Sequence, residues 1–217
     1  MKENIVSTID EFGLELTNPD QVRSRRDYNK YIIDFPSVFD FAAIKQYLIV
    51  ETAVFLRSYP SQIMTATSLI YDYLKGIGRD DLITQFDLDP FEVKVQRLER
   101  TFLDKLFAVG DYYLDGKVTE HSRHIYDLYK LADRVEIDEP LKILFKQVRE
   151  ERRGHAACHS AQENVDLKVL LQKIVAEGAY KNDYEAITEN LLFEKVPYET
   201  AVSALQKIVD SDLFSET

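Results

Sequence analysis

The chain has 217 residues, of which 45% are hydrophobic and 30% charged, as in a globular protein with one large domain or two small ones. Its formal net charge of −11 argues against a general nucleic-acid coat, which needs an excess of Lys and Arg, but leaves room for a local basic cleft. No apolar run approaches the roughly 20 residues of a membrane span, so no membrane partner is expected. The single cysteine, Cys158, excludes an internal disulfide and predicts a cytoplasmic protein.

The first half of the chain mixes helix and strand signals. Residues 3–13 predict an amphipathic helix, and residues 28–35 predict a strand. The run 47–56 is apolar on both faces and rich in β-branched residues, which predicts a central strand buried on two sides. Residues 61–74 predict a further helix, and residues 91–95 predict a short strand.

From residue 98 onward the apolar period is helical almost throughout, and Gly and Pro residues punctuate it. Helices are expected over residues 98–115, 121–134, 139–152, 163–177, 181–194 and 198–211. The predicted fold class is therefore α+β, with a small sheet of about three strands followed by a predominantly helical C-terminal bundle. The domain boundary is expected between a sheet domain, 1–97, and a helical bundle domain, 98–217.

A lysine interrupts the apolar face of the first long helix. Lys105 falls in the middle of this face, one turn beyond Thr101. The face itself is made of Leu98, Phe102, Leu106, Val109 and Tyr113. A buried ammonium is costly unless it has an anionic partner. Lys105 is therefore expected either to reach water past its neighbours or to point into a polar cleft, which would be a functional site.

A carboxylate interrupts the apolar strand in the same way. Glu51 shares a strand face with Ile49, Ala53 and Phe55, and the other face is equally apolar. Such a carboxylate must be paired, hydrogen-bonded, or holding a metal at the edge of a sheet. A salt bridge to a nearby Lys or Arg and a functional role both stay open on this basis.

The helix expected over residues 121–134 carries a polar face. Arg123 and Asp127 are spaced i,i+4 and share that face with Lys130 and Arg134. From spacing alone, such an arrangement indicates a solvated surface rather than a site.

A zinc site is an alternative that the histidines suggest. His121 and His124 are three residues apart, and His155 and His159 bracket Cys158. Two such pairs and a cysteine could form a tetrahedral site. Without a Cys-x-x-Cys or His-Glu-x-x-His frame, however, pairs of this kind are common by chance.

Three stretches, taken together, resemble a known family. They are Leu48-Ile-Val-Glu51-Thr52, Arg100-Thr-Phe-Leu-Asp104-Lys105-Leu-Phe-Ala108 and His121-Ser-Arg123-His-Ile-Tyr-Asp127-Leu-Tyr129. In this order and at these separations they resemble the AbiEii/AbiGii nucleotidyltransferase toxins, members of the polymerase-β-like nucleotidyltransferase superfamily. The helical pair Tyr184-Glu185 is also typical, and the resemblance covers nearly the whole chain.

The resemblance implies transfer of nucleotides from an NTP to an acceptor, with Mg²⁺ neutralising the phosphates. Relatives act on RNA, including the 3′ end of tRNA, and are silenced by an antitoxin protein. By resemblance, Glu51 is a metal-binding acid, Lys105 is the cation that holds the triphosphate, and Asp127 is the acid that closes the site. The implied substrate contacts are Thr101, Arg123, Arg152 and Arg153.

The sequence departs from the family at its first motif, a Gly-Gly-Ser/Thr turn that leads to an Asp-x-Asp strand. No Gly-Gly pair occurs in the chain, and Asp87-x-Asp89 follows Glu51 instead of preceding it. One carboxylate cannot hold the metal pair of in-line phosphoryl transfer. We therefore expect a family member without its N-terminal motif, inactive by itself, in which residues 1–97 form a partial nucleotidyltransferase sheet.

The competing expectation is a non-catalytic helical module, which binds a protein partner or completes an active site with another subunit. A sheet that lacks strands would leave an open edge and an apolar face. Such an edge would favour a homo-oligomer.

Overall fold

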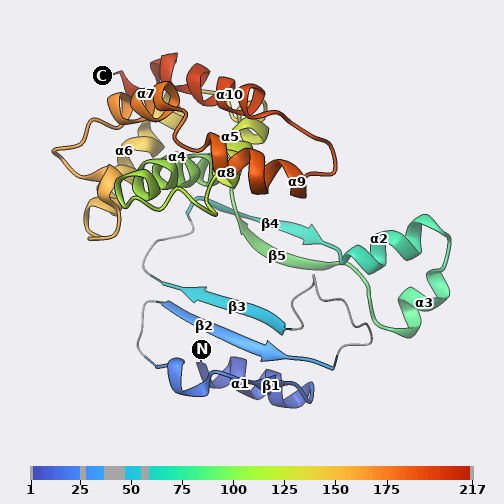
Figure 1. Cartoon of the computed structure of the whole chain (residues 1–217). Coiled ribbons are helices and arrows are strands. Elements are labelled where there is room, and N and C mark those ends of the chain that lie inside the picture. Colours follow the sequence, from blue (N-terminus) through green and yellow to red (C-terminus); the bar gives the residue numbers. More distant parts are fainter. Residues whose placement is uncertain (1, 25–27, 37–46, 55–58, 216–217) are drawn as a thin grey trace. The chain divides into compact units, whose positions relative to one another are not determined.

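The structure, a computed structural model, describes residues 2–24, 28–36, 47–54 and 59–215 (Figure 1). The chain forms two compact units, residues 1–57 and residues 58–217. Its fold class is α+β, as predicted, because a three-stranded antiparallel sheet precedes a series of helices. The division into domains at residue 97 remains a prediction. Among the described residues, no helix has the length and apolar character needed to cross a membrane.

The described part of the first unit contains an α-helix, the short 3-10 helix η1 (Pro19–Gln21) and a small meander. Helix α1 (Lys2–Glu11) is followed by strands β1 (Glu15–Leu16), β2 (Tyr28–Asp34) and β3 (Tyr47–Ala53), which pair in the order β1-β2-β3. Strand β2 alternates exposed and buried side chains, as expected for a strand with one covered face. The core of the unit consists of Ile9, Val22, Tyr31 and Ile33. The predicted first helix and first strand are confirmed.

Strand β3 is not the doubly buried central strand that its composition predicts. It is the edge strand of the described sheet, and Leu48, Ile49 and Val50 are 50%, 39% and 37% exposed. The buried side chains of this unit lie instead on α1, on β2 and before β2. An apolar run shows what a strand could bury, whereas its neighbours decide what it does bury. Phe55 lies outside the described residues.

The second unit begins with a pair of antiparallel strands. Strand β4 (Ser61–Ala66) pairs with β5 (Phe91–Gln96), in register from Ser61 opposite Gln96 to Ala66 opposite Phe91. The expected helix over residues 61–74 is therefore wrong in its first half. The strand forms because a partner about thirty residues further along the chain satisfies its backbone groups, which local periodicity cannot reveal.

Two short helices connect these strands. Helix α2 (Leu69–Gly76) starts after Ser68, whose hydroxyl accepts a hydrogen bond from the Tyr71 amide at 3.0 Å. This is a normal N-terminal cap, and it explains why the helix begins there and not at residue 61. Helix α3 (Asp80–Gln85) follows.

The rest of the second unit is helical, as predicted. Its longer helices are α4 (Leu98–Leu114), α5 (Arg123–Ala132), α6 (Glu139–Arg153), α7 (Leu167–Glu177) and α10 (Tyr198–Asp210). Shorter elements are η2 (His159–Ala161), α8 (Lys181–Asp183), the π-helix η3 (Tyr184–Thr188), α9 (Glu189–Leu191) and η4 (Asp212–Phe214). Helix α4 supplies much of the core, because Phe102, Leu103, Leu106, Phe107 and Val109 are at most 1% exposed. It packs against α5, α6, α7 and η2.

Helix α4 and η2 approach each other closely at a glycine. A Cβ added to Gly110 would lie 2.7 Å from the Cβ of Ser160 and 3.1 Å from Cδ2 of Leu170. The Ser160 hydroxyl lies 3.0 Å from the carbonyl oxygen of Phe107 and 2.7 Å from Oδ1 of Asp111. The absence of a side chain at Gly110 therefore permits these hydrogen bonds.

We predict that Gly110→Ala lowers the free energy of unfolding by about 1 to 3 kcal/mol, because the new methyl group has no room. Chemical denaturation measures this change. The matched control is Gly76→Ala, where no atom lies within 4 Å of the added Cβ. The control should leave stability unchanged or raise it slightly. Equal effects of the two substitutions would contradict the close approach.

Candidate functional site

Lys105 finds an anionic partner on the neighbouring helix. Its Nζ lies 2.8 Å from Oδ2 of Asp127 and 3.3 Å from Nδ1 of His124, both on α5. The side chains of Lys105 and Asp127 are 29% and 33% exposed, so their polar ends reach solvent. We call these three residues the Lys105 cluster. The structure thus brings together two residues that the sequence placed in separate motifs.

The geometry of α5 explains why His124 and Asp127 face Lys105 together. Residues three apart lie on the same side of a helix. The start of α5 is anchored by Asp183, whose carboxylate accepts hydrogen bonds from the amides of Glu120 and Ser122 at 2.9 and 3.2 Å. These bonds satisfy amide groups that have no partner within the helix.

An aromatic stack fixes the imidazole of His124. The ring of Tyr112 lies nearly parallel to that of His121, with centroids 3.5 Å apart, and to that of His124, with centroids 5.5 Å apart. The side chain of His124 is only 8% exposed. Its ring therefore has little freedom to turn away from Lys105.

The surroundings of His124 and Asp127 lower the pKa values of both side chains. Burial lowers the pKa of His124, and the positive charge of Lys105 lowers it further. The contact with Asp127 raises the pKa but does not cancel these two effects. Burial alone would raise the pKa of Asp127, but the contacts with His124 and Lys105 outweigh it, so the pKa is lowered. At neutral pH the cluster therefore contains a carboxylate and a neutral imidazole. A neutral imidazole can accept a hydrogen bond from the lysine ammonium through Nδ1.

Two other predicted substrate contacts lie on the same helices as the cluster. Thr101 is one turn before Lys105, where its hydroxyl donates to the carbonyl oxygen of Arg97 and accepts from Nε2 of Gln96, both at 3.2 Å. Arg123 is an exposed residue at the start of α5. Asp127 pairs with Lys105 across the two helices, although its spacing alone indicates a solvated face.

Arg152 lies in a buried network of charges. It is 6% exposed, and its guanidinium lies 3.1 Å from Oδ1 of Asp104 and 3.2 Å from Oδ2 of Asp111. Arg100, 2% exposed, pairs with the same Asp104 at 3.2 Å and with Glu151 at 2.9 Å. These contacts favour a structural role for Arg152, and contact with a substrate phosphate stays a prediction. Arg153, the next residue, lies elsewhere: its Nε donates to the carbonyl oxygen of Ala161 at 3.2 Å.

Glu51 belongs to the first unit and is exposed on β3. Its carboxylate accepts a hydrogen bond from the hydroxyl of Tyr28 on β2, which raises the pKa of Tyr28 to about 12. Of the alternatives that the sequence leaves open, the structure shows the hydrogen bond. The role of Glu51 as a metal ligand remains a prediction.

The described residues contain no group of three or more His, Cys, Asp or Glu side chains that could hold a metal ion. The zinc hypothesis finds no support either. His121 and His124 stack on Tyr112, His159 lies 3.0 Å from Asp115, and Cys158 contacts the guanidinium of Arg152.

Sequence reasoning did not assign His124, Tyr112 or Asp183 to the site. A signal existed for His124, because it precedes Asp127 by three residues and so faces the same neighbour. The contributions of Tyr112 and Asp183 depend on packing between distant segments, and no local pattern reveals them.

We predict that the stability of the protein depends on pH through His124. Its folded-state pKa is lower than the ordinary 6.5, so the unfolded chain binds more protons as the pH falls below that value. The stability associated with the neutral ring is therefore lost as the pH decreases. His124→Gln should make the free energy of unfolding fall less steeply between about pH 7 and pH 5. Denaturation at several pH values measures this, with His159→Gln as the control; an unaltered slope in His124→Gln contradicts the prediction.

A comparison with known protein families identifies the family of the chain. A family model described as nucleotidyl transferase AbiEii toxin, type IV TA system, matches residues 1–209 of the 217. No curated protein and no solved structure matches the chain. Since the match includes nearly every residue, the chain belongs to the AbiEii family of nucleotidyltransferase toxins, from type IV toxin–antitoxin systems.

Proposed function

We propose that the Lys105 cluster binds the triphosphate of an NTP, whose nucleotide is transferred to an RNA acceptor such as a tRNA. The observation that carries this proposal is the state of the Lys105 ammonium. It is held by Asp127 and His124, yet the side chain remains 29% exposed on a helix whose central apolar residues, such as Phe102 and Leu106, are buried. A cation of this kind is fixed in place and still reachable by a ligand.

The number of hydrogen-bond donors on Lys105 supports the same role. An ammonium group has three N–H donors. One points to Asp127 and one to His124, which leaves the third for a phosphate oxygen. Asp127 and His124 then orient the lysine before a ligand arrives. Binding therefore does not have to meet the entropy cost of ordering the flexible lysine side chain.

The chemistry of transfer needs more than this cluster. Mg²⁺ neutralises the phosphates in reactions of this class, and it prefers carboxylate ligands. We propose Glu51 as one such ligand; among the described residues, no group of three or more possible ligands surrounds a metal position. We further propose that this chain, which contains no Gly-Gly turn, acts in the cytoplasm, does not transfer nucleotides alone, and is controlled by the antitoxin of its system.

A second function is favoured by β3. This edge strand exposes Leu48, Ile49 and Val50, and one of its backbone edges pairs with no strand among the described residues. Such a strand can add to the sheet of a second copy or of another subunit, and that subunit could complete an active site.

We predict that Lys105→Ala weakens ATP binding by about tenfold or more, because a charge-assisted hydrogen bond to phosphate is lost. Isothermal titration calorimetry with each NTP measures the affinity. Lys130→Ala is the matched control, since Lys130 is an exposed lysine on α5 whose Nζ lies 5.9 Å from the ring centroid of Tyr129. Circular dichroism should show that both variants are folded. Equal affinities of Lys105→Ala and the unsubstituted chain would refute the assignment.

We also predict that the purified chain does not incorporate labelled nucleotide into RNA, because Glu51 alone cannot hold a pair of metal ions. The assay uses total tRNA, each labelled NTP and Mg²⁺. Transfer that disappears in Lys105→Ala would show that the chain is a complete enzyme.

A further inference from the structure

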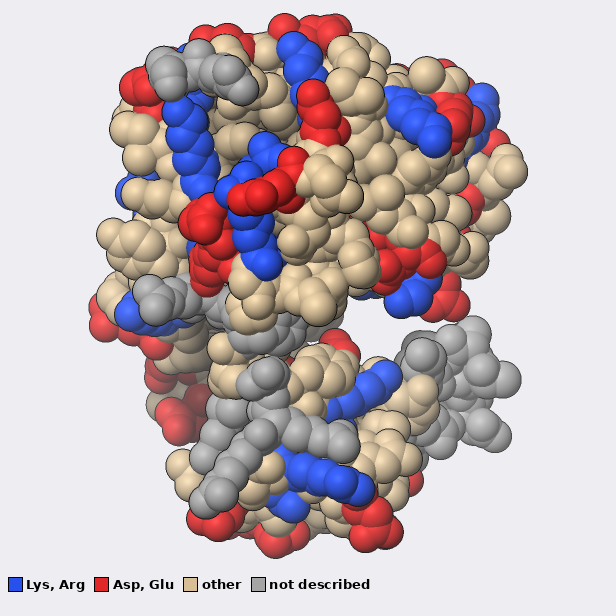
Figure 2. Space-filling model, turned by 90° about the vertical axis from the view of Figure 1, so that its left-hand side faces the viewer, with Lys and Arg blue, Asp and Glu red and all other residues tan. Residues whose placement is uncertain are grey.

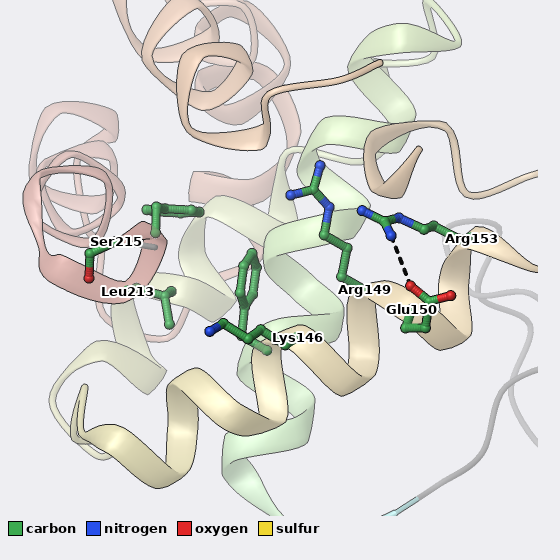
Figure 3. A pocket seen from close by; sticks show the side chains of 8 residues that line it. Lys146, Arg149, Glu150, Arg153, Leu213 and Ser215 are labelled. Atoms are coloured by element: carbon green, nitrogen blue, oxygen red, sulfur yellow. Dashed lines mark hydrogen bonds and ion pairs between the residues drawn. The ribbon is translucent and has the colours of Figure 1, made fainter. Parts of the chain in front are cut away.

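A pocket lies between α6 and η4 in the second unit. It has a volume of about 250 Å³, and Figure 3 shows its lining. Among the described residues, three cations, Lys146, Arg149 and Arg153, and one carboxylate, Glu150, line it. We call it the α6 pocket. It shares no residue with the Lys105 cluster, and its excess of positive charge is unusual in a chain of net charge −11.

Two arginines of the α6 pocket are bonded to the same acceptor. The carbonyl oxygen of Ala161 accepts a hydrogen bond from Nε of Arg149 at 3.4 Å and another from Nε of Arg153 at 3.2 Å. Nη2 of Arg149 also donates to the carbonyl oxygens of Gln162 and Val165, at 3.3 and 2.7 Å. Figure 3 shows both side chains rising from the same side of α6. The two guanidiniums are thus fixed next to each other before any ligand binds.

This arrangement has an electrostatic cost that an anion would relieve. Burial lowers the pKa of Arg149 and the like charge of Arg153 lowers it further, while the charge of Asp166 partly opposes both effects. Nη1 of Arg153 lies 2.8 Å from a carboxylate oxygen of Glu150 and 3.9 Å from one of Glu163, and these two carboxylates offset part of the positive charge. An arginine has five N–H donors, and the bonds from Arg149 to carbonyl groups use only Nε and Nη2. Donors therefore remain for the oxygens of a phosphate.

Part of the pocket lining is apolar and aromatic. Phe145 and Phe214 line it, with their rings edge to face and their centroids 5.6 Å apart. A flat ring can pack against such a pair, as bases do on the aromatic side chains of proteins that bind single strands. The volume is slightly below the usual range of about 300 to 1000 Å³ for ligand pockets, which suits one small unit.

We propose that the α6 pocket binds one nucleotide, with its phosphate at Arg149, Arg153 and Lys146 and its base against Phe214. The nucleotide is either free or the end of a polynucleotide. On the face that Figure 2 shows, basic side chains lie among acidic ones. The inference rests on the proposed function in one respect: a nucleotidyltransferase must hold an acceptor as well as an NTP.

The test compares two ligands, AMP and a fluorescent 12-nucleotide RNA. Lys146→Glu combined with Arg153→Gln should weaken the binding of one or both by about tenfold, because charged contacts to phosphate are lost. The salt dependence of RNA binding should fall by about 0.7 in logarithmic slope for each phosphate contact removed. The control is Lys207→Glu, an exposed lysine on α10 outside the pocket. Arg149 is left unchanged because it also holds the backbone of residues 161–165.

Loss of binding for both ligands supports a site for a free nucleotide, and loss for the RNA alone supports a site for the end of a polynucleotide. Phe214→Leu should weaken AMP binding, because the base loses its aromatic contact. Inorganic phosphate, added as a competitor for the phosphate position, should bind this variant as it binds the unsubstituted chain. The proposal is overturned if neither ligand binds, or if the double variant binds both as the Lys207→Glu control does. Calorimetry with ATP on Lys105→Ala, done in parallel, reports on the Lys105 cluster, so the two proposals can fail separately.

Discussion

The packing of helices in the second unit depends on the carboxylate of Asp104, which pairs with two buried guanidiniums. Asp104 lies 3.2 Å from Nε of Arg100 and 3.1 Å from Nη2 of Arg152. Arg100 continues to Glu151 on α6 and to the carbonyl oxygen of Tyr59 before β4, at 2.9 and 3.1 Å. The loss of one member of such a network leaves a charge unpaired in the interior, which costs about 3 to 5 kcal/mol. The network therefore fixes α4 against α6.

The arginine network explains why the adjacent residues Asp104 and Lys105 on α4 have different roles. Successive side chains of a helix point about 100° apart. With Asp104 directed to the arginine network, Lys105 is directed to α5, where Asp127 and His124 meet it. The acid of the Asp104-Lys105 pair thus serves the fold, and the lysine is the one that remains partly exposed. A family motif can combine a structural residue with a residue of the site in this way.

The sequence was informative where the relevant interaction is local. Helical period and punctuation by Gly and Pro predicted α4 to α7 and α10 closely, and a charge on an apolar face singled out Lys105. It was uninformative where a distant partner decides the outcome. The pairing of β4 with β5 turned residues 61–66 into a strand, and β3 remained exposed despite its apolar composition. The burial of Arg152 likewise depends on two carboxylates of α4, some forty residues earlier in the chain.

The π-helix η3 has a consequence for the site that lies on α4 and α5. A π-turn contains one residue more than an α-turn, so it rotates every side chain after it by roughly a quarter of a circle. The last residue of this turn, Thr188, reaches the hydroxyl of Ser122 at 2.7 Å, immediately before α5. Deleting a single residue from this π-turn would rotate Thr188 away from Ser122, and the start of α5 would lose this hydrogen bond. The length of the π-turn thus helps to position the start of α5, and with it His124 and Asp127, beside Lys105.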